Sequence, residues 1–300
     1  MSDSRETSAP RQVIGTKRFR EPMAKPITTR IFTVANQKGG VGKTTSAVNV
    51  AAALAMGGLK TLIIDLDPQG NASTAFGISR DEVNGMYEVI IKDLPMQSAA
   101  LKIPGYPSLE VIPATQSLAN AEVELVPMVA REMRLKKSLN NYLLDAANKG
   151  ERFDYVIIDC PPSLGLLTIN ALVAAQELMI PIQCEYYSLE GLTLLLHTVS
   201  LIQEHLNPNI KLTTILLTMF DGRTRLANDV AAEVRKHYNA ELIDIPIPRA
   251  VRISEAPSYG QTVMTYDPAS NGAEAYGLVA REIARRGAPS SNSNSEKGVG

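Results

Sequence analysis

A glycine- and lysine-rich segment near the amino terminus constrains this chain more than any other stretch. It consists of Lys38-Gly39-Gly40-Val41-Gly42-Lys43-Thr44-Thr45. A short apolar run at 31–35 precedes it, and a helical pattern with one apolar face follows it. Strand, glycine loop and helix in this order are the context that a phosphate-binding loop requires. Glycines leave room for a polyanion beside the backbone N–H groups, and the positive end of the helix dipole adds its field there.

The polar residues of this segment have defined roles if the ligand is ATP. Lys43 would contact the β- and γ-phosphates, and the Thr44 hydroxyl would ligate Mg²⁺. A glycine-rich turn that merely joins two elements would contain the same glycines, but Gly42-Lys43-Thr44 at a helix start favours phosphate binding. The segment departs from the ordinary pattern, because Gln37 stands where a glycine is usual and Lys38 adds a second lysine.

Apolar runs alternate with helical patterns along most of the chain. The runs predict strands at 31–35, 61–66, 109–112, 155–159, 178–183 and 213–219, with a shorter one near 242–245. The patterns predict helices near 43–57, 117–125, 129–148, 165–175, 188–206, 225–238 and 272–286. Several runs are continuously apolar, as in strands that are covered on both faces. We therefore expect an α/β fold, a mostly parallel twisted sheet with helices on both faces.

The composition is that of an ordinary globular protein, with 45% hydrophobic and 20% charged residues among 300. We expect one domain over 30–286, a flexible polar arm over 1–29 and a disordered tail over 287–300. Two cysteines, Cys160 and Cys184, make neither a disulfide framework nor a metal site. A net charge of -1 neither favours nor excludes nucleic acid, because local basic patches can bind phosphates. With no signal peptide or long apolar run, we expect a cytoplasmic protein without a membrane partner.

Three aspartates follow predicted strands. Asp65 and Asp67 close the run that starts at Thr61, and Asp159 closes the run that starts at Tyr155. Open parallel sheets bind ligands at the carboxyl ends of their strands. An acidic residue after four apolar ones is typical of a Walker B element, which holds Mg²⁺ directly or through water. Each aspartate could instead cap the helix that follows it.

These segments together resemble the ParA/MinD family of ATPases, whose deviant phosphate loop carries two lysines. The similarity is closest to the ParA/Soj-type chromosome-partitioning ATPases and runs from about Arg30 to Arg286. It rests on the loop, on Asp65-Leu66-Asp67-Pro68-Gln69-Gly70-Asn71, on Asp159-Cys160-Pro161-Pro162-Ser163, on Gln183-Cys184-Glu185-Tyr186-Tyr187, on Asp221-Gly222-Arg223-Thr224 and on the stretch 247–258. Residues 1–29 are too short and polar for the helix-turn-helix domain that other ParA proteins carry.

The resemblance implies that two ATP-loaded chains close face to face as a homodimer. Lys38 of one subunit then reaches the phosphates of the other, and Asp67 helps to position or activate the attacking water. The resemblance also implies that Asp65 helps to form the nucleotide site and that Asp159 contacts Mg²⁺ through water. A cationic side chain at the transferred phosphoryl group agrees with the charge that develops there.

The resemblance further implies non-specific binding of double-stranded DNA by the dimer, through Arg223 and Arg252. Pro248 and Arg249 are expected near the adenine. Hydrolysis, stimulated by DNA and by a ParB-like centromere-binding protein, would release the dimer from the nucleoid. Arginine suits this task because its planar fork can donate two hydrogen bonds to one phosphate.

Several alternatives remain open at this point. A MinD-like positioning ATPase would need an amphipathic carboxy-terminal helix, and after Arg286 only Val299 is a larger aliphatic residue. A nitrogenase-reductase-like carrier would need cluster-binding cysteines in other surroundings than those of Cys160 and Cys184. A small-molecule ATP-dependent ligase of the same superfamily, or a scaffold that binds nucleotide without turnover, would share the loop. ATPase assays with and without DNA separate the last two from a partitioning ATPase.

Overall fold

The computed structural model describes residues 17–81, 83–185 and 188–289. Its strands are β1 (Arg30–Val34), β2 (Thr61–Asp65), β3 (Leu101–Ile103), β4 (Tyr106–Ile112), β5 (Tyr155–Asp159), β6 (Glu177–Gln183), β7 (Lys211–Thr218) and β8 (Leu242–Ile243). Its helices are α1 (Lys43–Met56), α2 (Asn71–Ala75), α3 (Met86–Ile91), α4 (Ala121–Leu125), α5 (Arg134–Asn148), α6 (Leu166–Ala174), α7 (Ser188–His205), α8 (Arg225–His237), α9 (Val251–Glu255), α10 (Val263–Tyr266) and α11 (Asn271–Gly287). Short 3-10 turns are η1 (Lys17–Arg20), η2 (Met96–Ser98), η3 (Gln116–Asn120), η4 (Arg131–Met133) and η5 (Ala256–Tyr259).

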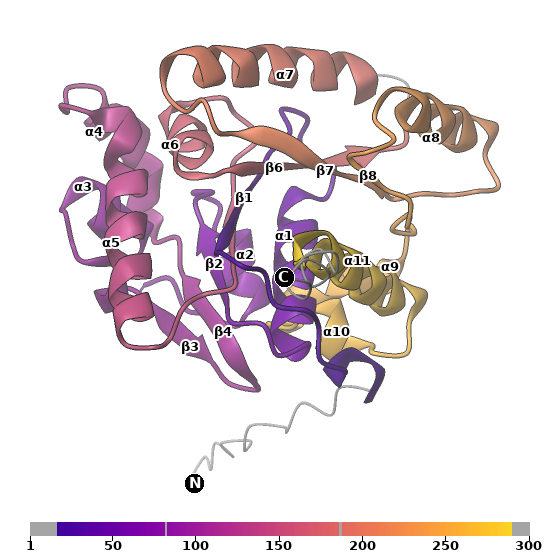
Figure 1. The fold of residues 1–300 in the computed structure, drawn as a ribbon, viewed down its shortest axis with the longest axis horizontal. Coiled ribbons are helices and arrows are strands. Elements are labelled where there is room, and N and C mark those ends of the chain that lie inside the picture. Colours follow the sequence, from indigo (N-terminus) through magenta and orange to yellow (C-terminus); the bar gives the residue numbers. More distant parts are fainter. Residues whose placement is uncertain (1–16, 82, 186–187, 290–300) are drawn as a thin grey trace, which may run out of the picture.

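The strands form one sheet in the order β3-β4-β2-β5-β1-β6-β7-β8, which is drawn in Figure 1. All neighbouring strands run parallel except β3, which is antiparallel to β4 at one edge. This confirms the predicted fold class. Asp159 at the end of β5 is in register with Asp65 of β2 and with Val34 of β1. The strand ends that precede the predicted site residues therefore lie in one row.

Two hydrophobic cores cover the two faces of the sheet. Val156 and Ile158 of β5 point into the core that α3–α8 cover, whereas Tyr155 and Ile157 point into the core under α1, α2 and α9–α11. The two groups of helices lie on opposite sides of the sheet in Figure 1. Side chains alternate between the faces of a strand. The continuous apolar runs thus supply both cores at once, as expected of buried parallel strands.

Most predicted elements match observed ones closely, but two helical predictions were partly wrong. The stretch 117–125 divides into a 3-10 turn and α4, and the helix predicted over 129–148 starts only at Arg134. Ala130 has φ 52°, a left-handed conformation that a right-handed helix cannot contain. The prediction also missed β3 and the short helices α2, α3, α9 and α10, which contain too few residues for a clear period.

The amino-terminal arm was expected to be free as far as residue 29, but its described part packs on the domain. Phe19 lies against Gly277 of α11, Met23 lies against Gly57 at the end of α1, and both side chains are buried. The Met23 N–H also donates to the Gly57 carbonyl at 3.0 Å. Glycines create these notches because a Cβ at either position would collide with the apolar side chain. The rest of the arm, 1–16, and the tail from 290 lie outside the described residues.

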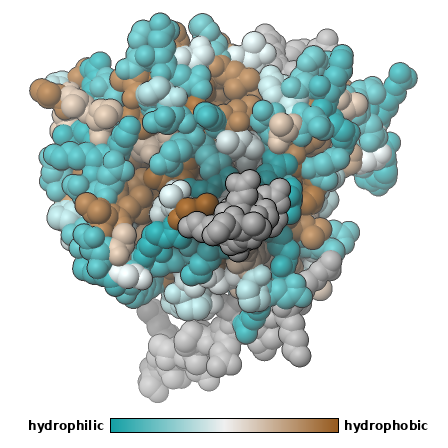
Figure 2. Space-filling view, viewed as in Figure 1, coloured by the Kyte–Doolittle hydropathy of each residue, from teal (hydrophilic) through white to brown (hydrophobic). Residues whose placement is uncertain are grey.

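The surface in the view of Figure 2 is mostly hydrophilic, and its hydrophobic side chains form separate groups. Within the described part of the chain, no helix combines the length and the apolar character that crossing a membrane demands.

Candidate functional site

The phosphate-binding loop joins β1 to α1 and exposes its backbone. Gly40 and Gly42 have φ of 73° and 85°, a region that favours glycine. A Cβ on Gly39 or Gly40 would meet no atom of the described residues within 4 Å, so these residues leave space over this part of the loop. Val41 is buried, and its carbonyl accepts a hydrogen bond from the Thr218 hydroxyl at 2.8 Å, which anchors the loop to the end of β7.

The amino-terminal end of α1 carries no side-chain cap. Its N-cap residue is Gly42, and the first turn contains no acidic residue. The first N–H groups of a helix have no partner within the helix, and together with the dipole they attract anions. The end of α1 is therefore built to receive a negatively charged group.

Lys43 is buried under the loop, with 7% of its surface exposed. Its ammonium group donates to the Lys38 carbonyl at 3.1 Å. Burial lowers the pKa of Lys43, and the carboxylates of Asp159 and Asp67 oppose this effect. A polyanion above the loop would stabilise the charged form further, since opposite charges favour ionisation.

Lys38 points to the end of β6. Its ammonium group lies 2.8 Å from the Glu185 carboxylate, which also accepts a hydrogen bond from the Gln183 amide at 2.6 Å. Glu185 belongs to the segment Gln183-Cys184-Glu185-Tyr186-Tyr187, which resembles a segment of the partitioning ATPases. The last two residues of that segment, Tyr186 and Tyr187, lie outside the described residues.

Asp159 is fully buried, and among the described residues neither of its carboxylate oxygens has a hydrogen-bond partner. Burial raises the pKa of Asp159 well above its usual range, and the neighbouring Asp65 carboxyl adds to the rise. The neighbouring side chains of Thr44 and Lys43 lower the pKa of Asp159 and so offset part of this rise. Neither makes a hydrogen bond of normal geometry to the carboxylate. An unpartnered buried carboxylate is costly unless a cation offsets it.

Asp65 is also fully buried, but its oxygens are used within the fold. The Ser73 N–H and hydroxyl donate to one oxygen at 2.7 and 2.6 Å, and the Asp67 N–H donates to the other at 3.3 Å. Burial raises the pKa of Asp65 to about 6, although the hydrogen bonds from Ser73 lower it. The hydrogen bonds of the Asp65 carboxylate therefore connect it to α2 and not to the phosphate-binding loop.

Asp67 lies two residues beyond the end of β2, in the turn before α2. Its carboxylate accepts the Gln69 N–H at 3.0 Å, and its carbonyl accepts the Gly70 N–H at 2.8 Å. Only 6% of its surface is exposed. The orientation of this carboxylate therefore depends on the backbone of residues 67–70.

The donor set around the loop fits a magnesium ion that is bound together with a nucleotide. Asp159 supplies unpartnered carboxylate oxygens, and Thr44 supplies a hydroxyl beside them. Among the described residues, no three His, Cys, Asp or Glu side chains are grouped as a protein-only metal site. Mg²⁺ commonly keeps several waters and takes the rest of its ligands from substrate phosphates.

Two cavities flank the loop. One of about 250 Å³ is lined by Gly42, Thr45, Thr218, Pro248, Arg249 and Tyr276, among others. The structure thus brings Pro248 and Arg249 together with the loop around one cavity. The other cavity, of about 210 Å³, is lined by Thr44 and Thr45 together with residues of α2, η5 and α10.

The arginines predicted to contact DNA lie on the surface. Arg223 is in the turn before α8 and forms a two-pronged ion pair with Asp221, at 2.8 and 2.6 Å. Arg252 lies in α9 and pairs with Glu255 at 3.2 Å. The side chains of Arg223 and Arg252 are 90% and 58% exposed. Both are accessible to a partner.

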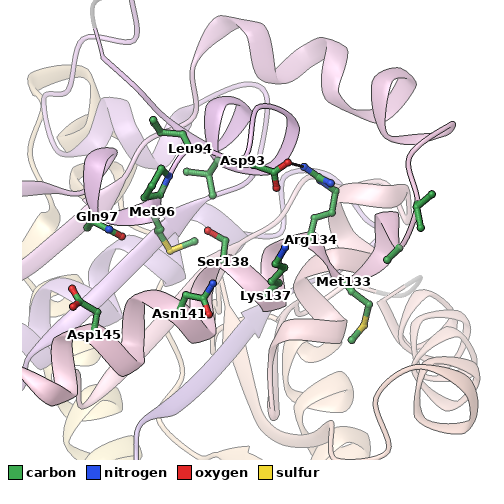
Figure 3. Close-up of a pocket in the computed structure, with 14 residues that line it drawn as sticks. Asp93, Leu94, Met96, Gln97, Met133, Arg134, Lys137, Ser138, Asn141 and Asp145 are labelled. Carbon is green, nitrogen blue, oxygen red and sulfur yellow. Dashed lines mark ion pairs between the residues drawn. The ribbon is translucent and has the colours of Figure 1, made fainter.

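A larger cavity, of about 570 Å³, lies between the end of α3 and helix α5. Figure 3 shows Ser138 and Asn141 of α5 on one wall and Met96 on the other, with Asp93 and Arg134 paired at one end. None of the predicted site residues lines it. Volume alone therefore does not identify the site in this protein.

Residue patterns did not single out several side chains that hold the site together. Arg80 and Ser73 tie the Asp67 turn to the turn after β4, and Thr218 anchors the loop. Their partners are mostly backbone atoms of distant segments, for which the sequence contains no signal. Glu185 was part of a motif, but nothing in the motif indicated that it pairs with Lys38.

Comparison with known proteins identifies the relatives of this chain. The family model described as "AAA domain" matches residues 29–212. The chromosome partitioning protein ParA of Myxococcus xanthus is 48% identical over 263 residues, covering 87% of this chain and 90% of the relative. The sporulation initiation inhibitor protein Soj of Bacillus subtilis is 49% identical over 259 residues, covering 86% of this chain and 99% of the relative.

Solved structures show the same fold. The cobyrinic acid a,c-diamide synthase of Mycobacterium smegmatis, solved with ADP and magnesium, superposes with a TM-score of 0.73 at 36% identity over 86% of this chain and 95% of that one. The cell division ATPase MinD of Pyrococcus furiosus gives a TM-score of 0.68 at 23% identity over 86% of this chain and 99% of that one. The likeness to MinD shows the fold alone.

Proposed function

Because this chain belongs to the ParA/Soj family of chromosome-partitioning ATPases, we propose that it hydrolyses ATP to control its own binding to DNA. In the ATP-bound state two copies form a sandwich dimer that binds double-stranded DNA without sequence preference. A ParB-like centromere-binding protein stimulates hydrolysis, which releases the dimer from the nucleoid. The chain acts in the cytoplasm, in the segregation of a chromosome or plasmid.

The unpartnered carboxylate of Asp159 beside the loop carries this proposal. A buried charge of this kind is retained where a ligand supplies the missing cation. Mg²⁺, held by Thr44 and through water by Asp159, would neutralise part of the phosphate charge. The N–H groups of the loop, from Gly39 to Thr45, and the ammonium group of Lys43 would bind the phosphates.

The remaining residues take part in the hydrolysis of ATP and in binding its adenine. Asp67 orients the attacking water, Lys38 leaves Glu185 and reaches the phosphates bound by the second subunit, and Pro248 and Arg249 contact the adenine. Asp65 contributes through Ser73 by holding the turn that carries Asp67. Positioning and charge stabilisation account for most of the catalysis of phosphoryl transfer.

Arg223 and Arg252 would bind DNA phosphates in the dimer. Both side chains are exposed and cationic, and both must exchange a carboxylate partner for a phosphate. Such binding releases counterions and falls steeply as the salt concentration rises.

Co-sedimentation with DNA tests this function directly. The purified chain is mixed with a non-specific duplex in the presence of ATP, ADP or no nucleotide, each with Mg²⁺. Sedimentation with ATP alone, together with hydrolysis that DNA accelerates, is the expected result. Binding that is equal in all three conditions, or an absence of ATP hydrolysis, would overturn the proposal.

A ligase remains the second candidate, because one solved structure at 36% identity is named as a cobyrinic acid a,c-diamide synthase. The higher identity to the partitioning proteins, 48% and 49%, favours partitioning. ATP turnover that depends on a small carboxylic acid and an amide donor, and that ignores DNA, would favour the ligase.

A further inference from the structure

Arg80 lies in the segment between α2 and α3, and its guanidinium group contacts two separate loops. On one side it donates to the carbonyls of Pro68 and Gln69, the latter at 2.6 Å. On the other side it donates to the carbonyls of Ala114 and Thr115, at 3.0 and 3.3 Å. Arg80 therefore joins the turn after β2 to the turn after β4.

The partners of Arg80 are backbone oxygens throughout. Among the described residues, no carboxylate lies within ion-pair distance of its guanidinium group. Hydrogen bonds from a charged donor are stronger than those between neutral groups, and the rigid fork of arginine fixes their directions. A full positive charge is thus used to orient main-chain groups.

One of these bonds reaches the carboxylate of Asp67 through a single peptide unit. The carbonyl of the Pro68–Gln69 peptide accepts from Arg80, and the N–H of the same peptide donates to Asp67 at 3.0 Å. A peptide unit is planar, so fixing its carbonyl also fixes the direction of its N–H. The guanidinium group of Arg80 therefore fixes the direction of the Gln69 N–H, which donates to the Asp67 carboxylate.

The other side of the contact is itself anchored. The N–H of Ala114 donates to the Ser73 hydroxyl at 3.0 Å, and Ser73 holds the buried Asp65 carboxyl. The β4 turn therefore does not move independently of the end of β2. Close approach is also built in at Gly70, where a Cβ would lie 2.3 Å from the Arg80 Nε.

We propose that Arg80 is a positioning residue for Asp67. Through the Pro68–Gln69 peptide, Arg80 holds the catalytic carboxylate of Asp67 in place. This inference rests on the proposed ATPase function, in which Asp67 orients the attacking water. None of these hydrogen bonds connects Arg80 to the phosphate-binding loop. Its loss should slow hydrolysis without weakening ATP binding.

The test compares kcat with ATP affinity in Arg80→Ala, Arg80→Lys and the unchanged chain, with Mg²⁺ and saturating DNA. Misplacement of a catalytic group by about 1 Å costs up to about a hundredfold in rate. We expect kcat to fall about tenfold to a hundredfold in Arg80→Ala, with an unchanged dissociation constant for ATP. Arg80→Lys keeps the charge but not the fork, so it should recover only a minor part of the rate.

Arg286 provides a matched control. Its guanidinium group also donates to backbone carbonyls, those of Thr213, Ala240, Glu241 and Leu242, near the opposite ends of the strands. Arg286→Ala should lower the melting temperature and leave kcat unchanged. In the Asp67→Ala background, Arg80→Ala should cause no further loss of rate, because both changes remove the same interaction.

The outcomes separate the two proposals. If the unchanged chain does not hydrolyse ATP, the proposed function fails. If it does, and Arg80→Ala keeps the full kcat, or loses ATP affinity together with it, the role of Arg80 is refuted. Full rates in Arg80→Lys, or additive losses with Asp67→Ala, would also contradict it.

Discussion

The ammonium group of Lys38 lies 2.8 Å from the carboxylate of Glu185, within the same chain. Lys38, the additional lysine of the phosphate loop, is thus held at the end of β6. In the proposed dimer the same lysine must reach the nucleotide of another subunit. The ion pair and the intersubunit contact therefore exclude each other.

Replacing Glu185 by glutamine should release Lys38 and favour the ATP-bound dimer. Partly exposed ion pairs contribute about 0.2–1 kcal/mol each, and the symmetric dimer must break two of them, so the dimerisation constant should rise by about twofold to thirtyfold. Sedimentation velocity with ATP measures the effect, and the increase should shrink at high salt. Glu151→Gln, which removes a pair with Lys60 remote from the loop, is the control. A weaker dimer in Glu185→Gln would show that Glu185 itself serves the dimer.

Removing Lys38 should separate nucleotide binding from turnover. Lys38→Ala is expected to abolish hydrolysis and ATP-dependent dimerisation while ATP still binds, because Lys43 and the loop backbone remain. Lys43→Ala should instead lose ATP binding. Equilibrium binding of a fluorescent ATP analogue and a phosphate-release assay measure the two properties. Full turnover by Lys38→Ala would refute the role assigned to Lys38.

The stability of the nucleotide-free protein should fall as pH rises. Burial raises the pKa of Asp65 to about 6 and that of Asp159 well above its usual range. An aspartate in an unfolded chain has a pKa of about 3.9. The folded state therefore binds more protons than the unfolded state above about pH 4, so stability is lost through about pH 6 and beyond. Melting temperatures between about pH 4 and pH 8 measure this. Stability that increases over this interval would contradict the assignment.

A neutral residue at position 159 should remove part of that pH dependence. Asp159→Asn removes the cost of burying an ionisable carboxyl group, so the nucleotide-free variant should be more stable at neutral pH and should lose the stabilisation by Mg²⁺ and ATP. The exposed Asp229→Asn is the control and should behave as the unchanged chain does. A variant that is stabilised by Mg²⁺ and ATP as strongly as the unchanged chain would rule out Asp159 as part of the metal site.

Arg223 and Arg252 should control DNA binding without affecting ATP binding. Each change to alanine is expected to weaken binding on all sequences and to reduce the slope of log affinity against log salt by about 2, because the dimer loses two phosphate contacts. Fluorescence anisotropy with a labelled duplex, measured over a salt series with ATP, reports both quantities. Arg285, which is exposed and paired with Glu282, serves as the control position. An unchanged slope in both variants would exclude them as phosphate contacts.

The loop and the strand ends could be predicted because their signals are local. Glycines at 39, 40 and 42 followed by Lys43 and Thr44 indicate a phosphate loop wherever a strand precedes them and a helix follows. Parallel strands present their carboxyl ends at one edge, so Asp159 and Asp65 were expected together and lie in register. The break before α5 could not be predicted, since the left-handed conformation of Ala130 has no signal in its residue type.

The sequence by itself determined the fold class and the nucleotide chemistry, because hydrophobic period and loop spacing depend on neighbours along the chain. Only the tertiary structure decided which carboxylate is left without a partner. Asp65 is satisfied by Ser73 and Asp159 is not, although both follow similar apolar strands. The same holds for Arg80, whose partners are carbonyls 11–12 and 34–35 residues away. Backbone oxygens are alike in every residue, so a contact with them can be recognised only once the chain has folded.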